Sequence, residues 1–344
     1  MNDSEWLTDK CIFINKFLRI GEWYDSKVPF LMCYTYIGMM AGYTMNTLEM
    51  YAKWVSGFIF CSLFLAYGYL INDYADRDVD RQAGKKKVIY DMSEGRIRVS
   101  LVMVIVLAVL PVWAASGFSL YVLFMAIITV FLGGSYSMPP FRFKERGVMG
   151  LIVSSVAQRC MPVLVLSGLF PVSHTLTGVF LICSLFSGMR YIFIHQVIDL
   201  ENDRKSGVHT FAEKNYETCV IGIYTVFVLE IISMAILLMM LHRPEVYVLL
   251  IPAFILEFMA CRAIHDCMAK PVFTTFYCVP GEAFYNIYLP LVLVLLVSVV
   301  QLRMIPVAVI TCAYLYRPCA KKIKLVGLFI KSRVRKRDSI SEKK

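Results

Sequence analysis

Apolar runs long enough to cross a membrane alternate along this chain with polar or charged segments. A spanning helix needs roughly 20 apolar residues, and candidate runs lie near 28–46, 51–72, 99–117, 119–137, 148–168, 174–195, 218–241, 245–264 and 283–301. A tenth, shorter run covers 304–317. In lipid only helices and closed barrels satisfy the backbone, and long runs without alternation are typical of helices. The pattern predicts an all-α, multi-pass integral membrane helical bundle of nine core transmembrane helices, with 304–317 as the tenth candidate.

The composition also indicates a membrane protein. The chain has 344 residues, of which 58% are hydrophobic and 17% are charged, and its mean hydropathy is +0.64. Soluble domains use about 45–50% apolar and about 25% charged residues. No Pro-, Gly- or Ser-rich linker divides the apolar runs, so we expect one transmembrane domain over 28–317. Residues 1–27 carry acidic side chains and show no signal peptide, so we expect an interfacial N-terminal segment, with 318–344 as a basic tail.

Positive charge is concentrated in particular connectors. The net charge is +10, and Lys and Arg gather after the second, fourth and sixth apolar runs and in the tail, whereas the connectors near 118 and 170 carry none. This distribution does not indicate a nucleic-acid partner. By the positive-inside rule it predicts that the N-terminus, the basic connectors and the tail face the cytoplasm. A cytoplasmic tail, which can also contact anionic lipid, favours counting 304–317 as a span; a re-entrant or interfacial segment is the alternative.

A dense group of carboxylates follows the second apolar run. Residues 71–81 read INDYADRDVDR, with four aspartates in eight positions. On a helix, residues three, four or seven apart share a face, and Asn72, Asp73, Asp76 and Asp80 have these spacings. The segment therefore predicts a stripe of oxygen ligands at a helix end. The alternative is a solvated loop whose acids balance its own Lys and Arg, but such a loop needs no particular spacing.

Adjacent carboxylates repel each other unless a cation neutralises them. Mg²⁺ prefers oxygen ligands and is often held by one or two carboxylates together with substrate phosphates. The remaining aspartate, Asp78, points away from this stripe, and we expect it to pair with Arg77 or Arg81. The cluster therefore predicts a site for divalent metal ions that hold a polyphosphate.

A second, thinner cluster follows the sixth apolar run. Asp199 and Asp203 are four residues apart and share a helix face, and His195 and Gln196 precede them. The latter two either cap the helix end or contact a second substrate. Both clusters follow an even-numbered run and precede a basic, glycine-containing stretch, which indicates a weak internal repeat. Duplicated halves that face each other would bring the clusters together across a central cavity opening to the cytoplasmic side.

These motifs resemble those of a known family. Asn72-Asp73-x-x-Asp76-x-x-x-Asp80 resembles the first aspartate-rich motif of the UbiA superfamily of intramembrane prenyltransferases, and Asp199-x-x-x-Asp203 resembles the second. Residues 136–147, which read YSMPPFRFKERG, resemble the connector after the fourth helix in many members. The expected helix number and topology also agree, so the resemblance covers nearly the whole chain.

The resemblance implies Mg²⁺-dependent transfer of an isoprenyl group from an allylic isoprenyl diphosphate to a small-molecule acceptor, often aromatic, within the membrane. It implies metal–diphosphate contacts from Asn72, Asp73, Asp76, Asp80, Asp199 and Asp203. It implies diphosphate contacts from cations, and the candidates are Lys144, Arg142, Arg77 and Arg19, although the proline that usually follows the arginine at Arg19 is absent. Tyr136 either touches substrate or anchors at the interface. We expect catalysis to depend most on Asp76, Asp199 and Lys144.

Other functions use similar residues. A terpene cyclase that quenches the allylic cation internally, or a transferase to a lipid or sugar-phosphate acceptor, would carry the same motifs. An ion-coupled transporter also places acids in a membrane, but usually near the bilayer midplane rather than at helix ends beside basic connectors. The acceptor, the prenyl chain length and the oligomeric state do not follow from the sequence.

Overall fold

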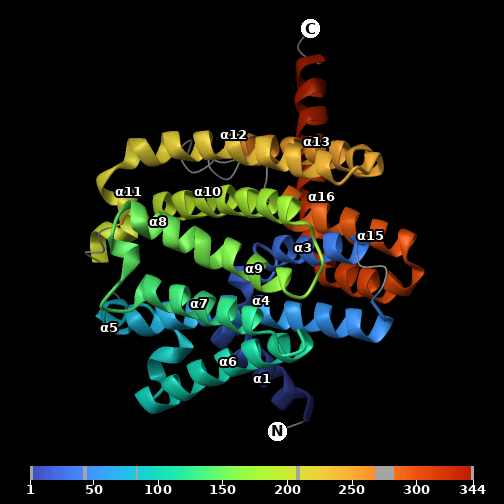
Figure 1. Cartoon of the computed structure of the whole chain (residues 1–344). Coiled ribbons are helices and arrows are strands. Elements are labelled where there is room, and N and C mark those ends of the chain that lie inside the picture. Colours follow the sequence, from blue (N-terminus) through green and yellow to red (C-terminus); the bar gives the residue numbers. More distant parts are fainter. Residues whose placement is uncertain (1–2, 42–44, 83, 207–209, 268–282, 342–344) are drawn as a thin grey trace. The chain divides into compact units, whose positions relative to one another are not determined.

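The computed structural model describes residues 3–41, 45–82, 84–206, 210–267 and 283–341. Every regular element within these ranges is a helix, which confirms the all-α prediction (Figure 1). The α-helices are α1 (Asp3–Leu18), α2 (Ile20–Trp23), α3 (Val28–Ala41), α4 (Thr47–Ala75), α5 (Arg77–Gln82), α6 (Glu94–Ala115), α7 (Leu120–Ser137), α8 (Val148–Ser155), α9 (Met161–Ser167), α10 (His174–Ser206), α11 (Phe211–Lys214), α12 (Tyr216–Met240), α13 (Pro244–Cys267), α15 (Leu289–Val300) and α16 (Ile305–Ser341). Short 3₁₀ or π segments are η1 (Val88–Asp91), η2 (Phe143–Glu145), η3 (Val156–Cys160), η4 (Phe284–Tyr288) and η5 (Leu302–Met304).

The chain folds as two compact units, which we describe separately. The first contains residues 1–24 and 37–241, and the second contains residues 25–36 and 242–344. All the candidate site residues named above belong to the first unit.

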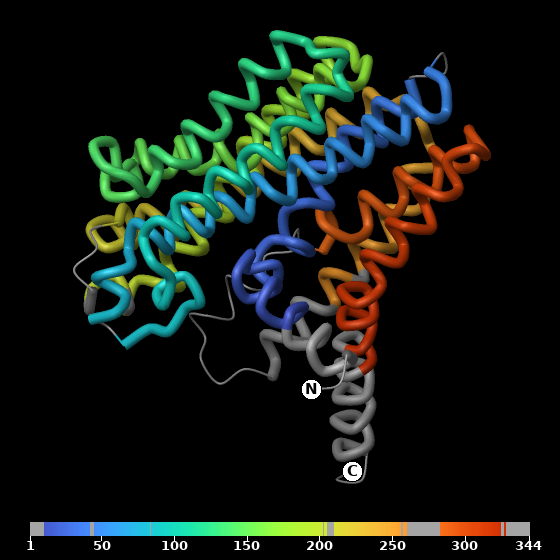
Figure 2. Tube along the Cα trace, turned by 90° about the horizontal axis from the view of Figure 1, so that it is seen from below, coloured from blue at the N-terminus to red at the C-terminus, as the bar shows by residue number. Residues whose placement is uncertain are grey.

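In the first unit, long apolar helices pack as antiparallel neighbours. Helix α4 lies along α6, and α10 lies along α12 (Figures 1 and 2). Asn46 caps α4 by accepting a hydrogen bond from the Glu49 amide at 2.8 Å, which satisfies one of the unpaired amides of the first turn. A tight turn follows α6, where Gly117 adopts a φ of 69° two residues after the helix ends. Short turns of this kind keep successive helices adjacent and antiparallel.

Two features hold α10 in the first unit. The buried side chains of Arg190 on α10 and Glu230 on α12 form an ion pair, with Arg190 Nη2 donating to Glu230 Oε1 at 3.2 Å. On another side of α10, Gly188 lies so close to α8 that an added Cβ would meet the Ser155 backbone at 3.0 Å. These contacts orient α10, whose C-terminal end carries Asp199 and Asp203.

The second unit is built from α13, α15, α16 and the first residues of α3. A buried carboxylate organises it: Glu257 accepts hydrogen bonds from the amides of Ala283 and Phe284 at 2.8 and 2.7 Å. Amides at a helix start have no partner within the helix, so a carboxylate there is stabilising. Tyr36 and Thr311 add a hydrogen bond of 2.9 Å between their hydroxyl groups.

Within the described residues, six helices are long and apolar enough to cross a membrane, namely α4, α6, α7, the α8–α9 segment, α10 and α12. The runs predicted at 28–46 and 283–301 appear as shorter apolar helices, Val28–Ala41 and Phe284–Val300. Residues 305–317 belong to α16, which continues to Ser341, so the boundary expected between 317 and 318 falls inside one helix. The chain is an integral membrane protein by these helices, and the count of nine spans stays a prediction.

Candidate active site

The first aspartate cluster lies where α4 ends. The helix stops at Ala75, and Asp76 follows with φ −100° and ψ 4° before α5 begins at Arg77. The run is therefore not one helix as the spacing suggested. The four-residue hydrogen bonds nevertheless continue across the break, from the Asp76 amide to Asn72 O at 3.0 Å and from the Asp80 amide to Asp76 O at 2.8 Å. These bonds keep Asn72, Asp76 and Asp80 at the predicted four-residue helical spacing across the break.

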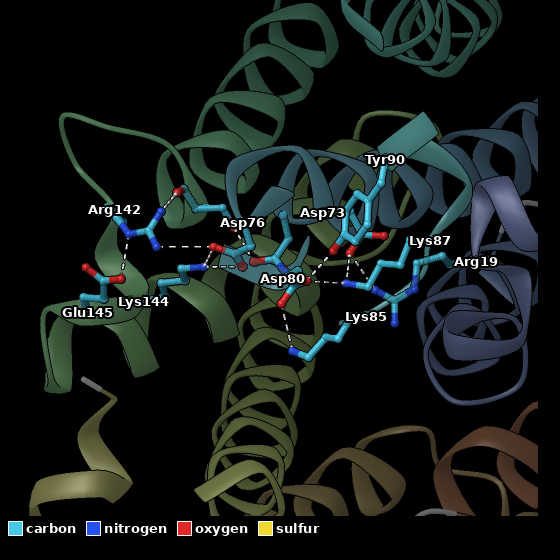
Figure 3. A network of polar contacts seen from close by, with 12 residues as sticks. Arg19, Asp73, Asp76, Asp80, Lys85, Lys87, Tyr90, Arg142, Lys144 and Glu145 are labelled. Atoms are coloured by element: carbon cyan, nitrogen blue, oxygen red, sulfur yellow. Dashed lines mark hydrogen bonds and ion pairs between the residues drawn. The ribbon is translucent and has the colours of Figure 1, made fainter. Parts of the chain in front are cut away.

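Arg19 and two lysines of the following connector bind the two most buried aspartates (Figure 3). Asp73 and Asp80 are 2% and 6% exposed. Lys87 Nζ lies between them, 2.7 Å from Asp73 Oδ1 and 3.0 Å from Asp80 Oδ2. Arg19 Nη1 donates to Asp73 at 2.9 Å, and Lys85 Nζ donates to Asp80 at 2.8 Å. Two carboxylates that would repel each other are thereby held close together.

The Tyr90 hydroxyl on η1 also donates to Asp80. Burial favours the neutral carboxyl, but the hydrogen bonds from Lys85, Tyr90 and Lys87 outweigh it and lower the pKa of Asp80 to about 2. The hydrogen bond from Lys85 to Asp80 likewise raises the pKa of Lys85. Asp80 is therefore an ionised carboxylate throughout the physiological pH range.

Asp76 is bound by a different pair of cations, on the other side of the cluster (Figure 3). Lys144 Nζ on η2 donates to both oxygens of Asp76, and Arg142 Nη2 lies 3.3 Å from Oδ1. Arg142 also donates to Glu145 at 2.6 Å. Burial lowers the pKa of Lys144 more than the Asp76 carboxylate raises it. The connector after α7 therefore brings both predicted cations, Lys144 and Arg142, onto Asp76.

The other predicted residues of this segment have structural contacts. Asn72 Oδ1 accepts a hydrogen bond from Ser137 Oγ at 2.9 Å, which joins α4 to the end of α7. Arg77 Nη2 donates to the carbonyls of Tyr90 and Met92 at 3.0 and 2.9 Å.

Arg81 also donates to the Tyr90 carbonyl. The expected pairing of Asp78 with Arg77 or Arg81 is therefore wrong: both guanidinium groups hold the η1 turn, and Asp78 is exposed. This turn carries Tyr90 and follows Lys87, so Arg77 and Arg81 position the segment that binds Asp80.

The second cluster lies on a continuous helix. Asp199 and Asp203 are one turn apart on α10, as predicted. His195 Nδ1 lies 2.8 Å from Asp199 Oδ2, and Thr210 Oγ1 donates to Asp203 Oδ2 at 3.1 Å. Gln196 is buried and accepts a hydrogen bond from the Ala212 amide at 3.2 Å, so it fixes the start of α11. Burial raises the pKa of Asp203, and Asp199 adds to that effect.

Aspartates of both clusters interact electrostatically with the same two side chains. Lys85 interacts electrostatically with Asp80, Asp199 and Asp76. Tyr136, which is half-buried near the end of α7, interacts electrostatically with Asp203, Asp76 and Asp199. The fold therefore brings the clusters within electrostatic range of one another.

Lys85, Lys87 and Tyr90 contact the cluster but were not among the predicted site residues. The sequence does show a basic run at 85–87, directly after the aspartates. Its charge served only to predict topology, because a run of lysines is usually a solvated face. Nothing in the local pattern marks Lys87 as the residue that bridges two carboxylates.

Comparisons with known proteins agree with this arrangement. The sequence model of the UbiA prenyltransferase family matches residues 31–276. A solved digeranylgeranylglyceryl phosphate synthase is similar, with 16% identity, a TM-score of 0.57, and coverage of 84% of this chain and 98% of that one. A UbiA homologue from Archaeoglobus fulgidus bound to GPP and Mg²⁺ has 22% identity, a TM-score of 0.55, and coverage of 81% and 98%. A comparison of this sequence with curated proteins found no match. At these identities the solved structures show a shared fold.

Proposed function

The chain belongs to the UbiA prenyltransferase family, and on that premise we propose that it transfers an isoprenyl group from an allylic isoprenyl diphosphate to an acceptor within the membrane, releasing diphosphate. The acceptor class that the family favours is aromatic. The observation that supports this most is the convergence of Lys144 and Arg142 on Asp76, within electrostatic range of Asp199 and Asp203. Carboxylates and cations gathered in one place suit a substrate that is itself a metal–polyphosphate complex.

Mg²⁺ is the metal that this donor set fits. The related homologue from Archaeoglobus fulgidus has been solved with DMAPP and Mg²⁺ as well as with GPP and Mg²⁺. Among the described residues, no three His, Cys, Asp or Glu side chains are grouped closely enough to hold a metal by themselves. Mg²⁺ is commonly held by only one or two carboxylates together with phosphates and water. The residues that would hold it are Asn72, Asp73, Asp76, Asp80, Asp199 and Asp203. When bound, it neutralises the diphosphate and so improves the leaving group.

The chain's own cations contribute to the same step. Lys144 and Arg142 exchange the Asp76 carboxylate for the diphosphate oxygens, and so stabilise the negative charge that grows as the C–O bond breaks. Arg19 and Arg77 are further candidates for this contact. Bond cleavage leaves an allylic cation, which aromatic faces stabilise. We propose that the Tyr136 ring supplies one such face. The acceptor attacks C1 of the prenyl group and loses a proton.

We place the reaction at the cytoplasmic face. In this arrangement nine helices, and a tenth at 304–317, cross the membrane around a cavity that opens to the cytoplasm. Residues 1–27 form an interfacial segment, 28–317 the prenyltransferase domain and 318–344 a basic tail, with both termini on the same side. The basic connectors that carry Lys85, Lys87 and Lys144 support this orientation by the positive-inside rule.

The test is a product assay on membranes that contain the full chain. Labelled allylic diphosphates of several chain lengths are supplied with Mg²⁺ and a panel of aromatic, lipid and sugar-phosphate acceptors, and products are identified by mass. We expect an acceptor that gains one prenyl group in place of a hydrogen, with release of diphosphate, and no product in EDTA. A hydrocarbon product made without any acceptor would instead identify a cyclase. An intact diphosphate under all conditions would contradict the proposal.

A further inference from the structure

A cavity of about 320 Å³ opens on the side of Asp73 that faces the N-terminal helix. It is lined by the end of α1, by α2, by Asp73 and by residues 86–89, which include the start of η1. None of Asp76, Lys144, Asp199 and Asp203 lines it. It therefore shares Asp73 and Arg19 with the first cluster but lies apart from Asp76 and the second cluster. Its volume lies within the usual range for a small ligand site.

The charged lining of this cavity is mostly cationic. Lys16, Arg19, Lys86 and Lys87 line it, against the carboxylates of Asp73 and Glu22. Arg19 and Lys87 are already engaged with Asp73, at 2.9 and 2.7 Å. Lys16 and Lys86 are exposed, and no hydrogen bond or ion pair joins either ammonium group to another of the described residues. Two unpaired cations from different segments that line one cavity favour an anion between them.

The mouth of the cavity lies beside an apolar surface. On α1, immediately before the lining residues, Ile12, Phe13 and Ile14 are 47%, 51% and 48% exposed. A helix that presents large apolar side chains next to lysines is typical of the membrane interface, where the apolar side chains enter the acyl region. At that depth the lysines stand at the level of lipid phosphates.

We propose that this cavity binds the phosphate headgroup of an anionic membrane phospholipid, held between Lys16 and Lys86. The phosphate oxygens accept charge-assisted hydrogen bonds from the two ammonium groups. Arg19 stacks over the Tyr69 ring at 4.9 Å and remains on Asp73, so the lipid site adjoins the first aspartate cluster without using its carboxylates. The N-terminal helix, which precedes the part of the chain matched by the family, thereby acquires a defined lipid partner.

The experiment measures binding alone, without metal or prenyl diphosphate, so its outcome is independent of the proposed transfer reaction. The purified full-length protein is placed in phosphatidylcholine nanodiscs, and binding of fluorescent phosphatidic acid is titrated. Unlabelled phosphatidic acid, phosphatidylcholine and inorganic phosphate serve as competitors. We expect competition by phosphatidic acid only.

The variants decide whether the cavity is the site. Each lysine near an anionic lipid contributes about a fivefold gain in affinity, so Lys16→Gln with Lys86→Gln should weaken binding by about 25-fold. The matched control, Arg96→Gln with Lys214→Gln, removes two exposed charges outside the cavity and should leave affinity within about twofold. Lys16→Arg with Lys86→Arg, which keeps the charge, should bind nearly as well as the native protein.

Three results would overturn the proposal. Equal losses in the glutamine pair and the control pair would show that only general surface charge attracts the lipid. Unchanged binding by the variant with Lys16→Gln and Lys86→Gln would show that the lipid binds outside this cavity. Strong competition by inorganic phosphate would identify a site for a free anion rather than a lipid. Thermal unfolding of every variant in detergent, expected to match the native protein because both lysines are exposed, confirms that the comparison is between folded proteins.

Discussion

The two aspartate clusters of this protein differ in how their charge is balanced. In the first cluster, Asp73, Asp76 and Asp80 are each in contact with a Lys or Arg side chain. In the second, His195 contacts Asp199 and Thr210 donates to Asp203. The first cluster is therefore held by direct lysine and arginine contacts, whereas the second is contacted by an imidazole and a hydroxyl group.

This difference suggests a division of work in the proposed reaction. Cations that are preorganised around the first cluster can move a short distance from a carboxylate to a phosphate. The second cluster is contacted by His195 and Thr210, so we expect it to depend more on a metal brought with the substrate. The first of the two motifs would then bring cations to the diphosphate, and the second would bring carboxylates to the metal.

The largest effect should come from the carboxylates themselves. Asp76→Asn and Asp199→Asn should each lower prenyl transfer by about a thousandfold or more, since each removes a charge that the metal–diphosphate complex requires. The measurement is kcat/KM in membranes, with insertion checked by immunoblot. Asp78→Asn, in the same segment but exposed, is the matched control and should stay within about twofold. Comparable losses in all three variants would contradict the assignment of these two clusters.

Cations should matter at the first cluster and not at the second. Lys144→Gln should lower kcat by about a hundredfold, because a preorganised donor to the leaving group is lost. Arg204→Gln, which removes an exposed cation beside the second cluster, should change kcat by less than about twofold. Steady-state kinetics with the allylic diphosphate varied would separate an effect on kcat from one on KM. If Arg204→Gln were the more damaging change, the proposed difference between the clusters would be reversed.

Stability should follow the same division. Lys87→Gln leaves Asp73 and Asp80 facing each other while Arg19, Lys85 and Tyr90 still contact them, so we expect a loss of about 1–2 kcal/mol in the free energy of unfolding. His195→Gln, at the half-exposed pair with Asp199, should cost less than about 0.5 kcal/mol. Thermal unfolding in detergent and EDTA measures both. A larger loss at His195 than at Lys87 would show that the first cluster is not the tighter network.

The smallest effect is a pair of opposite pH dependences. The pKa of Asp80 is lowered from 3.8 to about 2, so its contribution to stability is fully present above pH 3.8 and is lost as the pH falls towards 2. The pKa of Asp203 is raised above 3.8, so this carboxyl opposes folding once it ionises, as the pH rises through 3.8 and beyond.

Asp80→Asn should therefore reduce the loss of stability that occurs as the pH falls below 3.8. Asp203→Asn should reduce the loss of stability that occurs as the pH rises above 3.8. Melting temperatures measured in EDTA between pH 2 and pH 6, about the range in which carboxyl groups titrate, test both signs. Slopes of the same sign for the two aspartates would contradict the contrast between the clusters.

The sequence predicted the candidate site well where the pattern is local. Asp199 and Asp203 lie one turn apart on α10 because a four-residue spacing on a helix leaves no other choice. The Asp76 break was missed, since nothing in residues 71–81 other than the density of aspartates signals the end of α4. Asp78 was paired with its neighbours because nearby opposite charges are the default expectation, whereas Arg77 and Arg81 instead hold backbone carbonyls of the η1 turn.

By itself, the amino-acid sequence determines that this chain is a bundle of apolar helices with two acidic helix ends. Helical hydrogen bonds and hydropathy act within a few residues, so they can be read from the order of amino acids. Only the tertiary structure decides which cation meets which carboxylate. Arg19 reaches Asp73 across 54 residues, and Lys144 reaches Asp76 across 68. Such contacts depend on how whole helices pack, and packing is a property of many side chains acting together rather than of any local spacing.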